Sequence, residues 1–259
     1  MHEELHPAAE AGFAAGADRY ARGRPDFPPA ITDWLRERLG LGPGRLAVEL
    51  GAGTGKFTPR ILATGAGVVA VEPVDAMLAR LAADLPLVDA RHGTAAAIPL
   101  PDASADAVVC AQSFHWFATR EALQEICRVL KPGGRLALVW NVRDMTIPWM
   151  QRISAIIAPF EAGVPRQASG AWRTVFPFHG LGPLEEDAFV HLHSGTVEQV
   201  VVERTLSISF IAALPPEQQR TVLAELRAMI AANPDLAGAG RISVPYRTLA
   251  YSCVRLPVP

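Results

Sequence analysis

Short apolar runs alternate with amphipathic stretches from Leu46 onward. The runs RLAVEL, GVVAVE, DAVVCAQ and RLALVW are bounded by Gly, Pro or Asp, which is typical of parallel strands buried on both faces. Between them, three segments carry apolar residues at helical spacing: Phe57–Ala63, Asp75–Asp84 and Arg120–Leu130. The alternation predicts an α/β fold with a doubly wound sheet and right-handed crossovers.

The sequence before this core predicts an N-terminal helical cap over residues 1–40. A Pro-rich break, RGRPDFPP, is followed by an amphipathic helix over Ala30–Leu39, which Gly40 and Gly42 can end. The cofactor-binding core is expected over residues 44–142.

The sequence after the core differs in character. Residues 143–185 are rich in Trp, Phe, Pro and Gly and are longer than an ordinary connection, so they form either a folded excursion or an active-site lid; we favour an inserted lid. Residues 186–259 return to regular structure, with strands at AFVHLHSG and RISVPYRTLAYSCV and a helix over Pro215–Ala232. Tyr246 and Arg247 are expected in the final strand. We expect a single domain over residues 1–259.

Composition excludes several classes of protein. The 259 residues are 50% hydrophobic and 19% charged, with a net charge of −2 and no run of Lys or Arg, so a disordered tail and a nucleic-acid partner are both disfavoured. Three separated cysteines suggest neither a disulfide framework nor a metal site. Because no signal peptide and no apolar run of about 18 residues is present, we expect a cytoplasmic protein with no membrane partner.

A glycine-rich turn follows the first predicted strand, at Gly51, Gly53 and Gly55 in VELGAGTGKF. Glycines there let the backbone approach a ligand. The G-x-G-x-G spacing lacks a phosphate-binding GK[ST] group, and Glu49 would repel a pyrophosphate but suit a cation. Glu72, at the end of the second strand, can accept the hydroxyls of a ribose. These residues predict a ligand with a ribose, an ammonium-type charge and no required phosphate.

Four motifs in order carry a resemblance to a known family. They are ELGAGTGKF, VAVEP, GTAAAIPLPDASADAVVCAQSFHWF and ALQEICRVLKPGGRLALVW. The chain resembles the class I S-adenosylmethionine-dependent methyltransferases, in the methyltransferase 11 group that includes ubiquinone/menaquinone-biosynthesis-like and trans-aconitate methyltransferase-like enzymes. The resemblance covers roughly residues 44–142. It implies a Rossmann-like, seven-stranded, mostly parallel sheet flanked by helices, with S-adenosyl-L-methionine as cofactor and S-adenosyl-L-homocysteine as product.

The same resemblance implies roles for residues of the core. Gly51, Gly53 and Gly55 would line the methionine and ribose, with Glu49 near the amino group and Glu72 on the ribose hydroxyls. Thr94 and Ala95 would contact the adenine, and Gln112 would lie beside the methyl group. Where the family often has Asp, this chain has Glu49, which reaches an amine equally well. The usual Asp before the adenine turn is replaced by Asp89 and His92, and LKPGGRL is interpreted as a structural turn.

The acceptor side is predicted in SFHWF, after the fourth strand. His115 is a candidate general base or, alternatively, a hydrogen-bonded wall residue, and Trp116 and Phe117 either line the pocket or pack the next helix. Trp140, with Asn141, ends a strand, and Trp149 begins the segment 143–185, so these residues are further candidates for substrate contact.

A second group of candidates precedes the core, in RYARGRPDFP. This stretch is similar to one found in trans-aconitate methyltransferase-like enzymes. Tyr20 could close over the cofactor and Arg24 could pair with a substrate carboxylate; the alternative is a Pro-fixed loop with a solvated Arg.

These residues predict a methyltransferase that acts on an oxygen or nitrogen atom of a small molecule by in-line displacement. The acceptor would lie between the cap and residues 143–185. Two alternatives stay open, an NAD-dependent oxidoreductase, disfavoured by the glycine spacing and Glu49, and a non-catalytic S-adenosylmethionine-binding protein. The sequence does not predict an oligomeric state.

Overall fold

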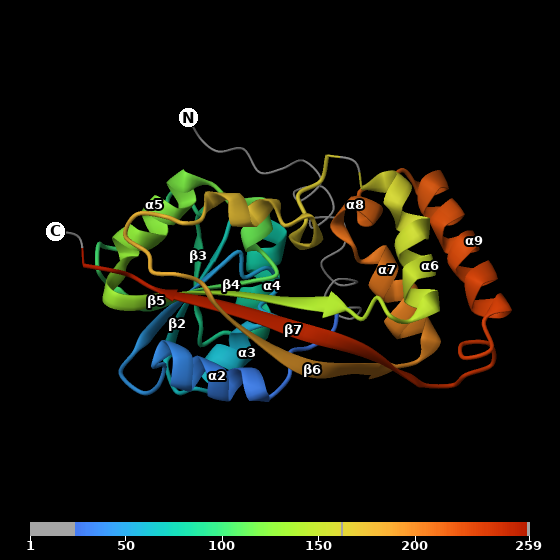
Figure 1. Cartoon of the computed structure of the whole chain (residues 1–259), viewed down its shortest axis with the longest axis horizontal. Helices are drawn as coiled ribbons and strands as arrows, with labels where there is room; N and C mark the ends of the chain where they lie inside the picture. The colour runs from blue at the N-terminus through green and yellow to red at the C-terminus, as the bar shows by residue number, and fades with distance from the viewer. Residues whose placement is uncertain (1–23, 162, 258–259) are drawn as a thin grey trace.

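A computed structural model describes residues 24–161 and 163–257, and its centre is a seven-stranded sheet (Figure 1). The strand order is β3-β2-β1-β4-β5-β7-β6. β7 runs antiparallel to both β5 and β6, and the other neighbours are parallel. The strands are β1 Leu46–Leu50, β2 Gly67–Glu72, β3 Asp89–His92, β4 Ala105–Ala111, β5 Leu130–Arg143, β6 Glu185–Gly195 and β7 Ile242–Val254. The predicted mostly parallel, Rossmann-like sheet is confirmed.

Helices cover both faces of this sheet. In chain order the described helices are α2 Ala30–Leu39, α3 Thr58–Leu62, α4 Asp75–Asp84, α5 Arg120–Val129, α6 Pro148–Ile157, α7 Arg204–Leu206, α8 Ser209–Ala212 and α9 Pro216–Ala232. α5 packs on one face of the sheet and α2 and α3 on the other (Figure 1). Each face therefore has its own hydrophobic core.

The predicted helix boundaries follow from local sequence signals. α2 ends where Gly40 takes a left-handed conformation with φ 65°, as its position predicts. α5 begins at Arg120, directly after Thr119, whose side chain caps the helix by accepting a hydrogen bond from the Ala122 N–H, and the helix buries Leu123 and Ile126 against the sheet. Residues next to each helix in the sequence therefore set the end of α2 and the start of α5.

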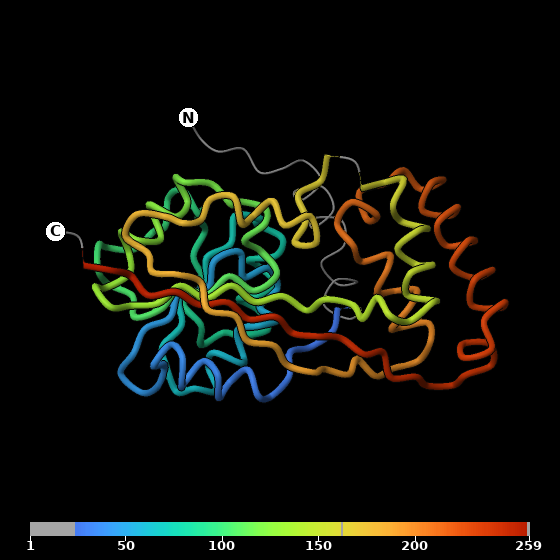
Figure 2. The backbone as a smooth tube through the Cα atoms, in the orientation of Figure 1, coloured from blue at the N-terminus to red at the C-terminus, as the bar shows by residue number. Residues whose placement is uncertain are grey.

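A second group of helices lies beyond the end of the sheet. We call it the helical lobe: α6, a π-helical turn over Glu198–Glu203, α7, α8 and α9. These elements share a separate apolar core. Figures 1 and 2 show β5, β6 and β7 extending from the sheet to this lobe. The lobe therefore stands at the end of β5 where Arg143 lies.

Residues 143–185 divide between the two parts of the molecule. α6 belongs to the core of the helical lobe, whereas a short 3₁₀ turn over Ala171–Val175 buries Trp172 against the α5 face of the sheet. The segment is thus a folded excursion with buried side chains, and closure over a substrate stays a prediction. Within the described ranges, no helix is long and apolar enough to cross a membrane.

Candidate active site

The loop after β1 lies at the carboxyl edge of the sheet, where open α/β sheets bind ligands. The N–H groups of Gly51 and Ala52 donate hydrogen bonds to the Val71 carbonyl, at 2.9 and 3.2 Å. Gly51, Gly53 and Gly55 have φ values of 65°, 60° and 78°, a region that favours glycine. The loop is therefore joined to the end of β2 in a conformation that glycine permits.

The three glycines meet different surroundings. A Cβ added at Gly51 would lie 2.6 Å from the Ser113 Cβ, and one added at Gly55 would lie 2.9 Å from the Leu85 Cδ1. At Gly53 the nearest atom would be the Met77 Sδ, at 3.7 Å. A Cβ at Gly51 would thus collide with Ser113, one at Gly55 would require the flexible end of the Leu85 side chain to move, and Gly53 leaves space beside the backbone.

Two buried carboxyl groups stand beside this loop. Glu72 accepts hydrogen bonds from the N–H of Gly53 at 2.8 Å and of Val74 at 3.0 Å, and Glu49 accepts one from the Thr58 hydroxyl at 2.6 Å. Their residues are 4% and 1% exposed. Burial raises the pKa of both groups, and it raises that of Glu49 to about 8. A cation entering here would stabilise the ionised Glu49.

The end of β4 carries a strained residue. Gln112 has a φ of 60°, although it is not glycine, and its side chain donates a hydrogen bond to the Asn141 carbonyl at 3.3 Å. Asn141 itself donates to the Asp26 carbonyl and accepts from Thr248. Such strain concentrates at ligand-binding positions. Gln112 therefore lies at the carboxyl edge of the sheet in a left-handed backbone conformation, held by hydrogen bonds to β5.

The predicted adenine turn follows β3. Ala95 is buried, and Thr94 pairs with Ala97 in an isolated bridge. The downstream part of the turn is held by α5, because Glu125 accepts a hydrogen bond from the Ile98 N–H and Arg128 donates to the Ile98 carbonyl, at 2.9 and 3.0 Å. Sequence reasoning assigned no role to these two charged residues, although both lie in the motif ALQEICRVLKPGG.

His115 lies after Gln112 and is fixed by Trp140. The Trp140 Nε1–H donates a hydrogen bond to the His115 Nδ1 at 3.2 Å. Desolvation and the positive charges of Arg24 and Arg166 lower the pKa of His115 to about 3. Because the indole can only donate, the neutral imidazole carries its proton on Nε2. The Nε2–H of His115 is therefore available as a hydrogen-bond donor, whereas the lone pair on Nδ1 already accepts the hydrogen bond from Trp140.

The aromatic candidates occupy different environments. Trp116 stacks beside His115 at 5.2 Å between ring centroids, and Phe117 packs edge-on against Phe114 at 5.7 Å. Trp140 is 1% exposed and lies 4.7 Å from the Trp172 ring, so it supports the wall from the core.

The remaining candidates lie further along the chain. Trp149 is buried in the core of the helical lobe. Arg24 donates a hydrogen bond to the Ser207 carbonyl at 3.3 Å, which brings it to the end of α7. Tyr20 lies outside the described residues. The structure thus gathers the glycine loop, Glu49, Glu72, Gln112 and His115 along one edge, and it places Trp149 in the lobe.

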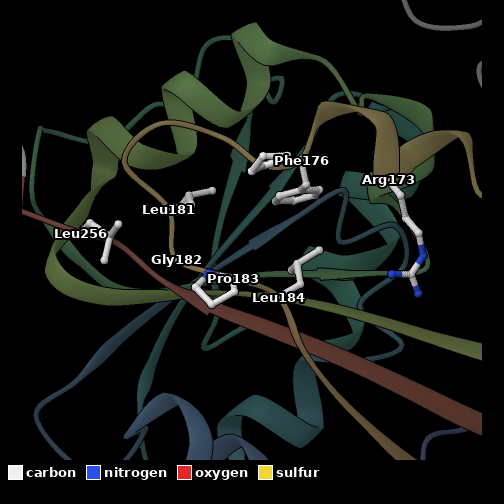
Figure 3. Close-up of a pocket in the computed structure, with 8 residues that line it drawn as sticks. Arg173, Phe176, Leu181, Gly182, Pro183, Leu184 and Leu256 are labelled. Atoms are coloured by element: carbon white, nitrogen blue, oxygen red, sulfur yellow. The ribbon is translucent and has the colours of Figure 1, made fainter.

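A separate open pocket lies elsewhere on the sheet (Figure 3). Leu181, Gly182 and Leu256 line it, and the Gly182 N–H donates to the Val254 carbonyl. Val254 pairs with Arg135, near the amino end of β5. This pocket is therefore distinct from the carboxyl edge that carries the predicted residues.

Comparison with known proteins decides the family. A family model described as a methyltransferase domain matches residues 48–138. A Schizosaccharomyces pombe protein named as an uncharacterized methyltransferase-like protein is 44% identical over 95% of this chain and 96% of its own length. The chain belongs to the methyltransferase family.

Two further similarities refine this assignment. A Mycolicibacterium smegmatis protein named as a probable S-adenosylmethionine-dependent methyltransferase is 30% identical to this methyltransferase over 76% of each chain. A solved structure from Anaeromyxobacter dehalogenans, provisionally named a type II methyltransferase, has a TM-score of 0.60 at 24% identity and covers 91% of this chain and 99% of that one. The structure shows the shared fold, and the relatives identify S-adenosylmethionine as the cofactor.

The residues at the carboxyl edge of this methyltransferase fit that cofactor. Gly53 leaves space where a side chain would stand, and Glu49 supplies a buried carboxyl group that an ammonium group would pair with and ionise. Each Glu72 oxygen accepts one backbone N–H and retains capacity for a hydroxyl. The cofactor class therefore agrees with the ribose and ammonium predicted from the sequence, and the oxidoreductase alternative is not supported.

Proposed function

We propose that this methyltransferase transfers the methyl group of S-adenosylmethionine to an oxygen or nitrogen atom of a small molecule by in-line displacement. The observation that carries the proposal is the position of Gln112 and His115 just after β4: Ser113, which lies between them, donates a hydrogen bond to the Leu50 carbonyl directly before the glycine loop, at 2.6 Å. In-line transfer requires the acceptor atom to approach the methyl carbon from the side opposite the sulfur. The protein mainly positions the two reactants and excludes water.

Each residue of the edge has a proposed part in binding the cofactor. When bound, S-adenosylmethionine supplies a methyl group on a positively charged sulfur. Glu49 pairs with its ammonium group, and Glu72 accepts the ribose hydroxyls. Gly51, Gly53 and Gly55 shape the loop, with Gly53 giving the closest approach. Thr94 and Ala95 contact the adenine, and Gln112 borders the methyl group.

On the acceptor side, we propose that His115 donates a hydrogen bond from Nε2 and does not act as a base. Trp140 occupies its lone pair, and a histidine with a pKa of about 3 is a weak proton acceptor at neutral pH. An acceptor that arrives unprotonated, such as a carboxylate, needs no base. Trp116 and Phe117 form the adjoining wall.

The proposal also concerns the whole chain. We propose one catalytic domain over residues 1–259, in which the acceptor lies between the cap and residues 143–185. Arg24 supports this placement, because it reaches the end of α7 from the cap side. The role of Tyr20 as a residue that closes over the cofactor stays a prediction from the sequence. We propose that Trp149 contributes by packing α6 into the core of the helical lobe.

The experiment is a transfer assay with tritiated S-adenosylmethionine and separate panels of carboxylic acids, phenols and amines. The expected result is label in a small-molecule fraction, with one equivalent of S-adenosylhomocysteine for each methyl group. Parallel reactions contain tRNA or a protein mixture. Label that enters only these macromolecules would contradict the proposal, as would cofactor binding with no transfer to any acceptor.

A further inference from the structure

The sheet ends in two edge strands that differ in length and in charge. β3, at one edge, has four residues, and Asp89, Arg91 and His92 are among them. β6, at the other edge, has eleven residues, and from Ala188 to Gly195 it carries no Asp, Glu, Lys, Arg or Pro. Short, charged edges resist pairing with other chains, whereas long apolar edges are templates for it. Most of β6 therefore lacks the features that protect β3.

Two large apolar side chains of β6 are exposed to solvent. Val190 is 80% exposed and Leu192 is 56% exposed, and neither belongs to a hydrophobic core of the described residues. Alternate residues of a strand share a face, so both side chains lie on the same face of the sheet. Arg247 of β7, which pairs with Val190, is exposed as well. Figure 1 shows β6 at the rim of the molecule, where it runs past α2 toward the helical lobe.

The acidic residues of β6 are confined to its beginning. Glu185, Glu186 and Asp187 open the strand, and the imidazoles of His191 and His193 lie in its second half. Like charges directly opposite each other destabilise a pair of strands. When the β6 strands of two copies run antiparallel, each acidic end lies opposite the imidazole end of the other copy, whereas parallel strands bring the two acidic ends together. Charge complementarity therefore favours an antiparallel pair.

One register suits both the apolar and the charged residues of β6. A two-fold axis through Val190 places Val190 of one copy opposite Val190 of the other, and Ala188 opposite Leu192. The same register places Asp187 opposite His193. Directly opposite residues of antiparallel strands point to the same face, so the exposed apolar side chains of the two copies meet on one face of a continuous sheet.

We propose that this protein forms a two-fold symmetric dimer, in which β6 pairs antiparallel with β6 of a second copy and the axis passes through Val190. The partner is another copy of this chain because the edge is complementary to itself under that axis, which closes the assembly at two copies. Pairing of β6 with the short, charged β3 would instead build an open filament. Backbone hydrogen bonds hold the two edges together, and the apolar side chains fix the register. The inference does not rest on the proposed function, because no residue of the methyl-transfer edge takes part in it.

The association is measured by sedimentation equilibrium of the full-length protein, over about 1 to 100 μM. The expected mass is twice the 27.7 kDa of one chain. Val190→Lys should raise the dissociation constant by about tenfold or more, because the axis places two like charges opposite each other. Leu87→Lys is the matched control, since Leu87 is 99% exposed and lies just before β3, at the opposite edge. This variant makes the same change of side chain and charge, and it should associate as the wild type does.

Cysteine cross-linking tests the register. Val190→Cys should form a disulfide between copies when treated with diamide, which takes up the two electrons and two protons that the thiols release. The two residues are expected within disulfide range, because they lie directly opposite each other. Leu192→Cys alone should cross-link much less, whereas a mixture of Ala188→Cys and Leu192→Cys should cross-link one variant to the other. The wild type is the control for the three native cysteines.

Several results would overturn the inference. They are the mass of one chain at every concentration, a dissociation constant of Val190→Lys equal to that of the wild type, equal weakening in Leu87→Lys, and masses above that of two chains. Self-cross-linking of Leu192→Cys as efficient as that of Val190→Cys would indicate parallel strands and would overturn it too. The cross-linking variants add no charge, so they test the interface independently of Val190→Lys. None of these measurements requires turnover, so a failure of methyl transfer in the assay above is distinguished from a failure of this interface.

Discussion

Three glycines in one loop have different physical requirements. All three have a left-handed φ; a Cβ at Gly51 would collide with Ser113, one at Gly55 would require the end of the Leu85 side chain to move, and one at Gly53 would find space. The sequence predicted all three from their spacing. It could not separate packing from ligand approach, because that distinction depends on residues far away in the chain. The same holds for Trp140: its expected position at a strand end predicted substrate contact, but β5 continues to Arg143 and the Trp140 ring is buried and hydrogen-bonded to His115.

Substitution of Gly53 tests the approach of the cofactor. Gly53→Val should lower affinity for S-adenosylhomocysteine at least tenfold, since the branched side chain fills the space beside the backbone. Gly238→Val is a matched control, because Gly238 also has a positive φ, of 73°, with open space around it. Both variants should lose roughly 1–2 kcal/mol of stability from backbone strain. Equal affinity of Gly53→Val and Gly238→Val by calorimetry would contradict this placement.

The buried Glu49 should make stability depend on pH. Its pKa is about 8 in the folded protein against an ordinary value of 4.5, so between these values the folded state holds a proton that the unfolded state has released. The free energy of unfolding of the cofactor-free protein should therefore fall as pH rises through this window, by on the order of a few kcal/mol. Urea denaturation across the window should show a smaller fall in Glu49→Gln; an identical fall would exclude Glu49 as the source.

The Trp140–His115 hydrogen bond predicts that His115 is not a general base. Loss of a base usually costs a factor of 10² to 10⁴ in rate, so His115→Gln, which retains a donor, should lose about tenfold or less in kcat. Because the pKa of His115 is about 3, the pH profile of kcat near pH 6.5 should be the same in the wild type and in His115→Gln. A steady-state pH profile with an inflection there that His115→Gln abolishes would restore the role of a base.

At the scale of elements, local signals predicted most boundaries. α4 spans Asp75–Asp84, as the apolar spacing indicated, and α2 ends at Gly40. Residues 143–185 were harder to predict, because their structure depends on long-range burial. Trp172 packs against the sheet and α6 packs in the lobe, and no periodic pattern encodes either contact. The residues that hold the predicted adenine turn were missed for the same reason, since Glu125 and Arg128 bind the amide and carbonyl groups of Ile98, 27 and 30 residues earlier.

The contacts of α5 predict that Arg128 positions the predicted adenine turn. Arg128 donates to the carbonyls of Ile98 and Leu100 and pairs with Glu125. Arg128→Met should lower the free energy of unfolding by about 1–3 kcal/mol, because the part-buried carbonyls of Ile98 and Leu100 lose a charged donor. It should also weaken cofactor binding severalfold. Arg120→Met, on the same helix, is the control. If calorimetry gives the two variants equal affinity for S-adenosylhomocysteine, Arg128 does not affect cofactor binding through this turn.

At the scale of the whole molecule, a sheet and a helical lobe meet at the carboxyl end of β5. The sequence predicted the sheet because its strands are short, apolar and regularly spaced, and the family resemblance implied seven of them. The lobe could not be assembled from sequence, because its core joins α6 to helices about 50 residues later.

The most direct measurement is a crystal structure of the protein with S-adenosylhomocysteine. The account predicts the ligand at the carboxyl edge, with its backbone contacts at Gly53, its ribose hydroxyls on Glu72, its ammonium group on Glu49 and its sulfur facing Gln112 and His115. Ligand density at the pocket lined by Leu181 and Leu256, or at the carboxyl edge with neither Glu49 nor Glu72 in contact, would contradict it.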